Sequence, residues 1–279
     1  MVEPLSSDAA PDLIAAGGER LSRLERAQIR FIRHTFESQP LDRAVRICQR
    51  LFGSRWITFC TQRLTHLHHL DRLPELTGDQ SVLLVSNHRS FFDLYVITAN
   101  LVKRGMKHRI LFPVRSQFFY DSPLGFAVNG AMSFFAMYPP IFRERARAAV
   151  NLASLEEISH RLTQRGVFVG IHPEGTRNLG DDPYALLPAQ TGVGRVVHRA
   201  KVPVIPVFIN GLQNDILRQI RGNFDGTGEP IHVVFGAPVD FGELLSAAPS
   251  PRTSRAITDR CMEAITELGQ EERRIRQGD

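Results

Sequence analysis

The segment VLLVSNHRSFFDLY, residues 82–95, runs from a short apolar stretch through a polar turn into a second apolar pattern. Its first part, VLLVS, is short, contains β-branched residues and predicts a buried strand. A helical pattern follows from about residue 90 to residue 104. A strand that leads directly into a helix is the unit from which α/β folds are built.

The same alternation continues along the rest of the chain. Proline lacks the N–H that a strand ladder needs, so Pro203 and Pro206 limit one predicted strand to an edge or irregular position. The pattern predicts an α/β fold with a central, mostly parallel sheet flanked by helices. The further strands are predicted at residues 108–114, 167–171, 202–209 and 232–236, and the further helices at residues 152–165, 189–200 and 252–276.

The N-terminal part of the chain has a different character. Residues 20–63 carry ten arginines and three acidic residues, and apolar residues recur every three or four positions from Leu41 to Phe52. This spacing predicts a basic amphipathic helical extension. Two interpretations remain open, because its apolar face could pack on the following domain or lie on an anionic membrane surface. We expect residues 1–18 to be disordered and residues 19–72 to form this amphipathic, membrane-associating region.

Composition narrows the class of protein. The 279 residues carry a net charge of +5, which fits an anionic partner such as a phosphorylated substrate, an anionic lipid or nucleic acid. The three cysteines are scattered, so we expect neither a disulfide framework nor a cysteine metal site. We expect no signal peptide and no membrane-spanning helix, because no uninterrupted apolar run is long enough.

His88 and Asp93 follow the predicted strand at residues 82–86, at the end where ligands collect in open α/β sheets. On one continuous helix, residues five apart point about 140° away from each other. The two side chains can therefore meet only if His88 lies in a turn, with Ser90 as the expected N-cap of the helix. Asp93 could then hold one imidazole nitrogen and leave the other as a base. The alternative is a turn histidine with an aspartate that the helix dipole favours.

A second strand leads into polar residues in the same way. In VFVGIHPEGTRN, residues 167–178, the predicted strand is followed by His172, Glu174, Thr176 and Arg177. Gly175 allows the backbone to approach a ligand closely, and the planar guanidinium of Arg177 suits a phosphate. Because both segments follow strand ends, we expect these groups to lie beside His88.

These segments resemble the glycerolipid acyltransferase family, which includes bacterial 1-acylglycerol-3-phosphate acyltransferases. NHRSFFD at residues 87–93 matches the family's first block, Asn-His-x-Ser-x-x-Asp. HPEGTR at residues 172–177 matches the third block, usually Phe-Pro-Glu-Gly-Thr-Arg, and VPVIPV at residues 202–207 matches the fourth. The resemblance covers roughly residues 75–245 and makes residues 73–279 the expected acyltransferase domain.

The resemblance implies direct acyl transfer, without a covalent enzyme intermediate, a metal ion or another cofactor. His88 is expected to deprotonate the acceptor hydroxyl, and Asp93 to orient and stabilise His88. Acyl-CoA or acyl carrier protein is the expected donor, and 1-acylglycerol 3-phosphate the expected acceptor, giving phosphatidic acid. The residues that the resemblance assigns to substrate binding are Asn87, Ser90, Arg115, Arg143, Glu174, Gly175, Thr176 and Arg177.

The implied partners are the donor, a lysophospholipid acceptor and an anionic membrane, with no nucleic acid, and the implied location is peripheral on the cytoplasmic side. Two alternatives remain open. The acceptor could be glycerol 3-phosphate, another lysophospholipid or a lyso-aminolipid, or the chain could be a non-catalytic basic lipid-binding module. The charge-free segment at residues 122–142 is either core or one wall of an acyl-chain groove.

Three features depart from the family pattern. His172 stands where the third block usually has phenylalanine, and Arg115 stands where lysine is frequent. The second block is blurred, and Arg143 is our choice among three arginines for a second phosphate contact. A separate run, THLHHL at residues 65–70, is predicted to be a helical face, since it lacks a carboxylate or cysteine partner for a metal.

Overall fold

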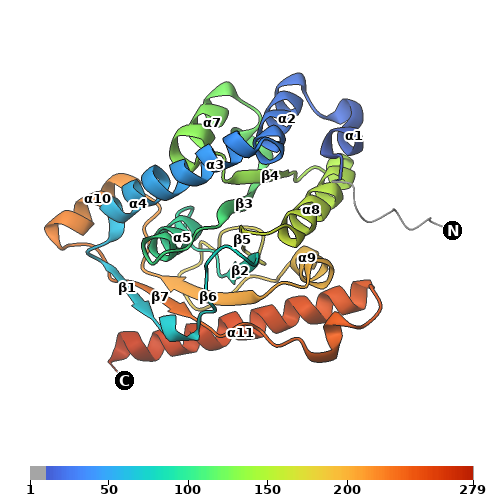
Figure 1. The fold of residues 1–279 in the computed structure, drawn as a ribbon. Helices are drawn as coiled ribbons and strands as arrows, with labels where there is room; N and C mark the ends of the chain where they lie inside the picture. Colours follow the sequence, from blue (N-terminus) through green and yellow to red (C-terminus); the bar gives the residue numbers. More distant parts are fainter. Residues whose placement is uncertain (1–10, 279) are drawn as a thin grey trace.

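The computed structural model describes residues 11–278, which form a seven-stranded sheet in the order β1-β7-β6-β2-β5-β3-β4 (Figure 1). β6, β2, β5, β3 and β4 are parallel, whereas β7 is antiparallel to β6 and parallel to β1. This confirms the predicted α/β fold with a mostly parallel sheet. The strands are β1 (Thr65–His68), β2 (Val82–Ser86), β3 (Arg109–Arg115), β4 (Met137–Ile141), β5 (Val167–Ile171), β6 (Val204–Asn210) and β7 (Ile231–Phe235).

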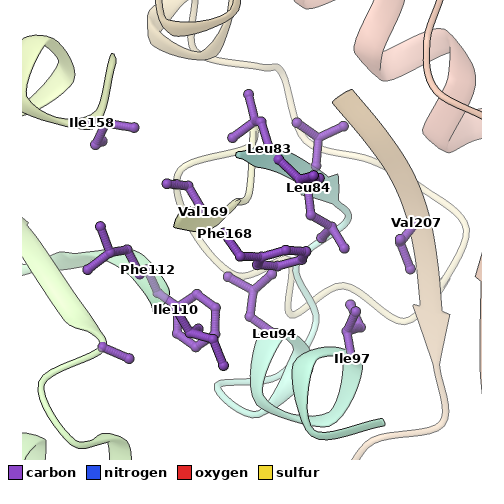
Figure 2. Packing of buried hydrophobic residues seen from close by; sticks show 14 of the residues in the cluster. Leu83, Leu84, Leu94, Ile97, Ile110, Phe112, Ile158, Phe168, Val169 and Val207 are labelled. Atoms are coloured by element: carbon purple, nitrogen blue, oxygen red, sulfur yellow. The ribbon is translucent and has the colours of Figure 1, made fainter. Parts of the chain in front are cut away.

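Helices cover both faces of the sheet. Neighbouring side chains on a strand point to opposite faces, and all five residues of β2 are buried. Figure 2 shows Leu94 and Ile97 of α5 packed near Leu84 and Phe168. The helices are α1 (Leu13–Gly17), α2 (Arg23–Glu37), α3 (Gln39–Cys48), α4 (Ser54–Thr61), α5 (Asp93–Lys103), α6 (Ser116–Phe119), α7 (Pro123–Val128), α8 (Ala148–Thr163), α9 (Gly192–Ala200), α10 (Ile216–Asp225) and α11 (Pro251–Gln277).

The strand that contains Pro206 lies inside the sheet, so the prediction of an edge or irregular position was wrong. β6 pairs with β2 on one side and with β7 on the other. The shared register with β7 begins at Val207, one residue after the proline. The missing N–H of Pro206 therefore stands outside that register, and the rest of the strand pairs normally.

Two boundaries differ from the sequence prediction. Residues 65–68, predicted as a helical face within the N-terminal extension, form the edge strand β1 and pair with β7. Residues 1–10 lie outside the described residues, but residues 13–17 of the segment expected to be disordered form α1, with Leu13 fully buried. The burial of Leu13 explains this order, because the short helix contributes apolar surface to the core.

The N-terminal extension is helical and packs on the rest of the molecule. Ser22 and Glu25 form a capping box that starts α2. α2 buries Ile29 and Ile32, and α4 buries Ile57, in the common core. Figure 1 shows α2, α3 and α7 on one side of the sheet and α11 on the other. The packed interpretation of the extension therefore holds for these side chains, while several other apolar residues of the same helices stay exposed.

A buried arginine joins the extension to the sheet. Arg109 of β3 is fully buried, and its Nη1 lies 2.8 Å from Asp42 Oδ1 on α3. Its Nη2 donates to Thr35 Oγ1 at 2.8 Å, and its guanidinium lies 4.1 Å from the ring centroid of Phe36. These contacts make α2 and α3 part of the same packed body as the sheet. Within residues 11–278, no helix combines the length and the apolarity needed to cross a bilayer.

Candidate active site

The side chains of His88 and Asp93 meet just beyond the carboxyl end of β2. His88 Nδ1 lies 3.2 Å from Asp93 Oδ2. A carboxylate oxygen only accepts hydrogen bonds, so Nδ1 carries the proton and Nε2 is the unprotonated nitrogen. No group of residues 11–278 hydrogen-bonds Nε2, and 18% of the His88 side chain is exposed. The imidazole is thus oriented on one edge and open on the other, as a general base requires.

The turn between β2 and α5 makes this contact possible. α5 begins at Asp93, so His88 lies in the turn, as expected. Asp93 Oδ2 also accepts the backbone N–H groups of Arg89 and Ser90, both at 2.8 Å. The helix was predicted to begin near Ser90, with that serine as N-cap, but it begins three residues later. The Asp93 carboxylate binds two N–H groups of the turn, and the Ser90 hydroxyl accepts a third, that of Phe92.

Burial sets the protonation states of the pair. Burial and the positive charge of Arg177 lower the pKa of His88 to about 4, so the imidazole is neutral at pH 7. Burial raises the pKa of Asp93 to about 6, and His172 and the backbone N–H groups of the turn oppose that rise. The carboxylate therefore remains ionised at pH 7. A neutral imidazole beside an ionised carboxylate can accept a proton, and the resulting imidazolium is stabilised.

Two residues expected to bind substrate are occupied by the protein itself. Asn87 is buried, and its side-chain amide donates to the carbonyl of Ile209 at 2.9 Å and accepts the N–H of Ile209 at 2.8 Å. Ser90 is fully buried, and its hydroxyl donates to the carbonyl of Gln213 and accepts the N–H of Phe92. The geometry assigns both residues to positioning: they fix the His88 turn against the end of β6.

Glu174 holds the two loops together. It is buried, its Oε1 accepts the backbone N–H of His88 at 2.8 Å, and its Oε2 accepts that of Leu187 at 2.7 Å. Both oxygens are thus used within the protein, and Glu174 positions the His88 turn. Gly175 has a φ of 67°, a conformation that side-chain-bearing residues adopt rarely. It turns the chain back so that Thr176 and Arg177 are exposed next to the site.

Exposed arginines gather at the carboxyl ends of the neighbouring strands. Arg143, which follows β4, donates to Thr176 Oγ1 at 3.1 Å, and Arg177 donates to Asn214 Oδ1 at 2.9 Å. Neither arginine forms an ion pair with a carboxylate within residues 11–278. Arg115 is exposed at the end of β3, where it pairs in register with Ile141 at the end of β4. Arg143 and Arg177 therefore supply positive charge that no carboxylate of the described residues pairs with.

The sequence placed His172 among the polar groups expected beside His88 but assigned it no role in the site. His172 follows β5, and its ring stacks on that of His88 with centroids 3.8 Å apart. Arg89 contributes to the site and was not predicted. Its guanidinium donates to the carbonyl of Gly180 at 2.8 Å and holds the loop after the HPEGTR segment. A histidine placed directly after a strand, where the related pattern has phenylalanine, was the available signal for His172.

The ligand atoms of His88, Asp93 and His172 lie within 4.8 Å of one another, near enough to share a metal ion. Imidazole lone pairs lie in the ring plane, and the two rings are parallel to within 5°. The two lone pairs therefore do not converge on one ion. Asp93 Oδ2 already accepts three hydrogen bonds. This arrangement suits proton transfer better than metal coordination.

The separate histidine run has partners elsewhere in the fold. His68 Nε2 lies 3.0 Å from Nδ1 of His232 on β7, and His69 Nε2 lies 2.9 Å from Glu271 on α11. His68 and His69 therefore have side-chain partners in segments that lie far along the chain. These contacts join β1 to β7 and α11.

An apolar groove of about 700 Å³ lies on the N-terminal side of the molecule. Trp56, one of its lining residues, has ring contacts with Phe92 and Tyr95, which flank Asp93 in the sequence. Trp56 therefore stands between the groove and the helix that begins at Asp93. Its lining combines residues of α3, of the helical turn Gln49–Gly53 and of α4 with part of the charge-free segment: Cys48, Leu51, Phe52, Arg55, Trp56, Ala131, Met132 and Phe134.

A family model described as "Acyltransferase" matches residues 64–210, which is more than half of the chain. The matched region contains both polar loops and the strands that carry them. This confirms the resemblance noted from the sequence.

Relatives with assigned names match over shorter stretches. The human 1-acyl-sn-glycerol-3-phosphate acyltransferase beta is 28% identical over 132 residues, 47% of this chain and 42% of that protein. The 1-acyl-sn-glycerol-3-phosphate acyltransferase of Haemophilus influenzae is 25% identical over 138 residues, 48% of this chain and 50% of that protein. Tafazzin of Drosophila melanogaster is 26% identical over 117 residues, 39% of this chain and 30% of that protein. The chain spans half or less of the length of these relatives.

Proposed function

Because the chain belongs to the acyltransferase family, we propose that it acylates the free hydroxyl of 1-acylglycerol 3-phosphate to give phosphatidic acid, with acyl-CoA or acyl carrier protein as donor. The observation that carries the proposal is the His88–Asp93 pair, whose outer nitrogen Nε2 has no protein partner. The names of two of the matched relatives favour this acceptor.

His88 and Asp93 perform the proton transfers of the proposed reaction. Nε2 takes the proton of the acceptor hydroxyl, and the oxygen forms a bond to the carbonyl carbon of the thioester. Asp93 stabilises the imidazolium that results. When the carbonyl double bond re-forms, the C–S bond breaks and the thiolate receives the proton from Nε2. Every proton removed from the acceptor thus leaves with the thiol.

Arg143 and Arg177 support an acceptor that carries a phosphate. Both guanidinium groups lie at the mouth of the site without a carboxylate partner in the described part of the chain. A guanidinium binds phosphate through two parallel hydrogen bonds, which gives direction as well as charge. We therefore assign them to the acceptor phosphate, with Arg115 as a further positive charge at the neighbouring strand end.

The apolar groove supplies a place for the fatty chain. Ala131, Met132 and Phe134 of its lining belong to the charge-free segment at residues 122–142, which favours the groove-wall interpretation for this part of it. Each buried methylene contributes about 0.8 kcal/mol, so a long chain would be held firmly. Trp56 connects the groove to the helix that begins at Asp93.

Peripheral attachment to a membrane fits the outer surface of α3, α4 and the helical turn between them. Ile47, Phe52 and Phe59 are 51%, 57% and 57% exposed, although they are large and apolar. Arg43, Arg50 and Arg55 of the same helical segment are exposed as well. Exposed apolar side chains within a basic surface are typical of helices that lie on anionic bilayers.

The proposal is tested with purified protein, a set of acyl donors and a set of acceptors, with products identified by mass spectrometry. We expect phosphatidic acid from 1-acylglycerol 3-phosphate, and a decrease in kcat of about 10²-fold or more when His88 is replaced by alanine. His66→Ala, the same change at an exposed histidine on β1, is the matched control and should keep wild-type turnover. Turnover by His88→Ala at the wild-type rate, or product only from acceptors without phosphate, contradicts the proposal.

A further inference from the structure

The ring of His172 lies face to face with the ring of His88. The two centroids are 3.8 Å apart, and the ring planes differ by 5°. This contact follows from the register of the sheet, because Val85 of β2 pairs with Ile171 of β5. The residues that follow these two positions therefore leave the sheet side by side. One face of the imidazole of His88 is covered by a second imidazole.

The ring of His172 is itself fixed. Its Nδ1 lies 3.2 Å from the carbonyl oxygen of Ser86 and 3.1 Å from the hydroxyl oxygen of the same residue. A carbonyl oxygen only accepts, so Nδ1 of His172 carries the proton and donates to it. Ser86 is fully buried at the end of β2. The plane of the His172 ring is thus fixed by hydrogen bonds to β2, the middle strand of the seven-stranded sheet.

The charge state of His172 suits this position. Burial and the adjacent His88 lower the pKa of His172 to about 3, so the ring is neutral at pH 7. A neutral ring does not oppose the positive charge that His88 acquires when it takes a proton, whereas a cation at 3.8 Å would. The stacked partner therefore contributes shape without adding a competing charge.

A hydrogen bond to Asp93 alone leaves the ring of His88 free to tilt about that bond. From the stacked geometry we propose that His172 is a positioning residue, which fixes the plane of the His88 imidazole so that Nδ1 faces Asp93 while Nε2 faces the acceptor hydroxyl. This inference rests on the proposed function. On this inference, the flat shape of the side chain at position 172 is what fixes the plane of the His88 imidazole. A phenylalanine would supply the same flat surface, but without the hydrogen bond to Ser86.

Two variants of similar size separate flatness from simple filling of space. His172→Phe keeps a flat ring, and His172→Leu keeps apolar volume without one. We expect kcat to decrease about 10-fold or more in His172→Leu, with KM for the acceptor within about twofold, because a small misplacement of a reacting group is costly. His172→Phe should retain more than about a third of the wild-type kcat. Equal kcat values for the two variants, or a wild-type kcat in His172→Leu, overturn the inference.

Nitrogen-15 NMR of the histidine side chains gives a readout that does not depend on turnover. In the wild type and in His172→Phe, His88 should show a single tautomer with the proton on Nδ1 at pH 7. In His172→Leu the two nitrogens of His88 should show averaged shifts, as the ring leaves Asp93. An unchanged single tautomer in the folded leucine variant contradicts the positioning role. If the wild type acylates none of the acceptors, the proposed function fails while this measurement still decides the role of His172.

Discussion

Glu174 accepts the backbone N–H of His88 at 2.8 Å, so the loop after β5 holds the very residue that carries the candidate base. The second oxygen of the same carboxylate accepts the N–H of Leu187 at 2.7 Å. One buried side chain thereby ties three segments of the chain together. This explains why the two sequence blocks that resemble the acyltransferase family lie together in the fold.

Glu174→Gln should weaken both the site and the fold. The amide oxygen can still accept one backbone N–H, but the amide NH₂ group would face the other N–H, donor against donor. We expect the free energy of unfolding to fall by about 1–3 kcal/mol, and kcat to decrease about 10-fold. Chemical denaturation and steady-state kinetics check the two effects. Glu267→Gln, on the outer surface of α11, is the control and should change neither.

Asp93→Asn should separate orientation from charge. The amide oxygen can still accept the N–H groups of Arg89 and Ser90, so the turn should persist. The neutral amide no longer stabilises an imidazolium, and we expect kcat to fall about 10²-fold or more with little change in KM. Circular dichroism establishes that the variant is folded. A variant that is folded and fully active would show that Asp93 has only a structural role.

Arg177→Ala should change the pH dependence of the reaction. The positive charge of Arg177 lowers the pKa of His88, so its removal raises that pKa. Activity is lost as His88 becomes protonated, and the acidic limb of the kcat/KM profile should therefore move to higher pH. KM should rise for acceptors with a phosphate and stay constant for acceptors without one. Arg252→Ala, at an exposed arginine of α11, should leave both the profile and KM unchanged.

The stability of the fold should decrease as the pH falls from 7 towards 4. Burial lowers the pKa of His172 to about 3 and that of His232 to about 4, below the value of about 6.5 in an unfolded chain. The unfolded state therefore binds more protons than the folded state in this range, and stability is lost as pH falls. His88 shifts in the same direction, whereas the raised pKa of Asp93 opposes it. Thermal unfolding at several pH values should give a flatter profile for His232→Gln than for the wild type.

Attachment to anionic vesicles should depend on exposed phenylalanines of the N-terminal helices. Replacing Phe52 and Phe59 together with serine removes two large apolar side chains from the surface without touching the catalytic pair. We expect the partition coefficient in vesicle flotation to fall more than about 10-fold, since each buried phenylalanine contributes about 1.5–3 kcal/mol. Leu152→Ser, at a 40% exposed residue of α8, is the control. Equal flotation of the double variant and the wild type would place the contact elsewhere.

Local patterns were sufficient for the fold class, whereas the central pair also required the family resemblance. β2 is a short apolar run and α5 a periodic one, so their order was readable from the sequence. The residues alone made a meeting of His88 and Asp93 conditional on a turn between them, and the family resemblance favoured that meeting. By contrast, the interior position of Pro206 depended on where pairing with β7 begins, which no local pattern specifies. The edge strand at Thr65–His68 likewise depends on a partner far along the chain.

The roles of polar residues within the blocks were harder to predict. Asn87 and Glu174 have side chains that suit a ligand, and only the distant backbone groups of Ile209 and Leu187 show that both are engaged. The proposed role of His172 could not be predicted from its side chain either, because that role depends on the stacking of its ring on the ring of His88. Such assignments require the register of neighbouring strands, which is a property of the assembled sheet.

The buried contact between Arg109 and Asp42 has a practical consequence for dissecting this protein. Deleting the helices that precede β1 would strip a fully buried guanidinium of its carboxylate and of the Thr35 hydroxyl, and unpaired buried charges cost about 3–5 kcal/mol. A shortened chain that begins at β1 would therefore misreport both catalysis and lipid binding through misfolding. The proposed membrane attachment is therefore to be tested by altering the outer side chains of the intact chain.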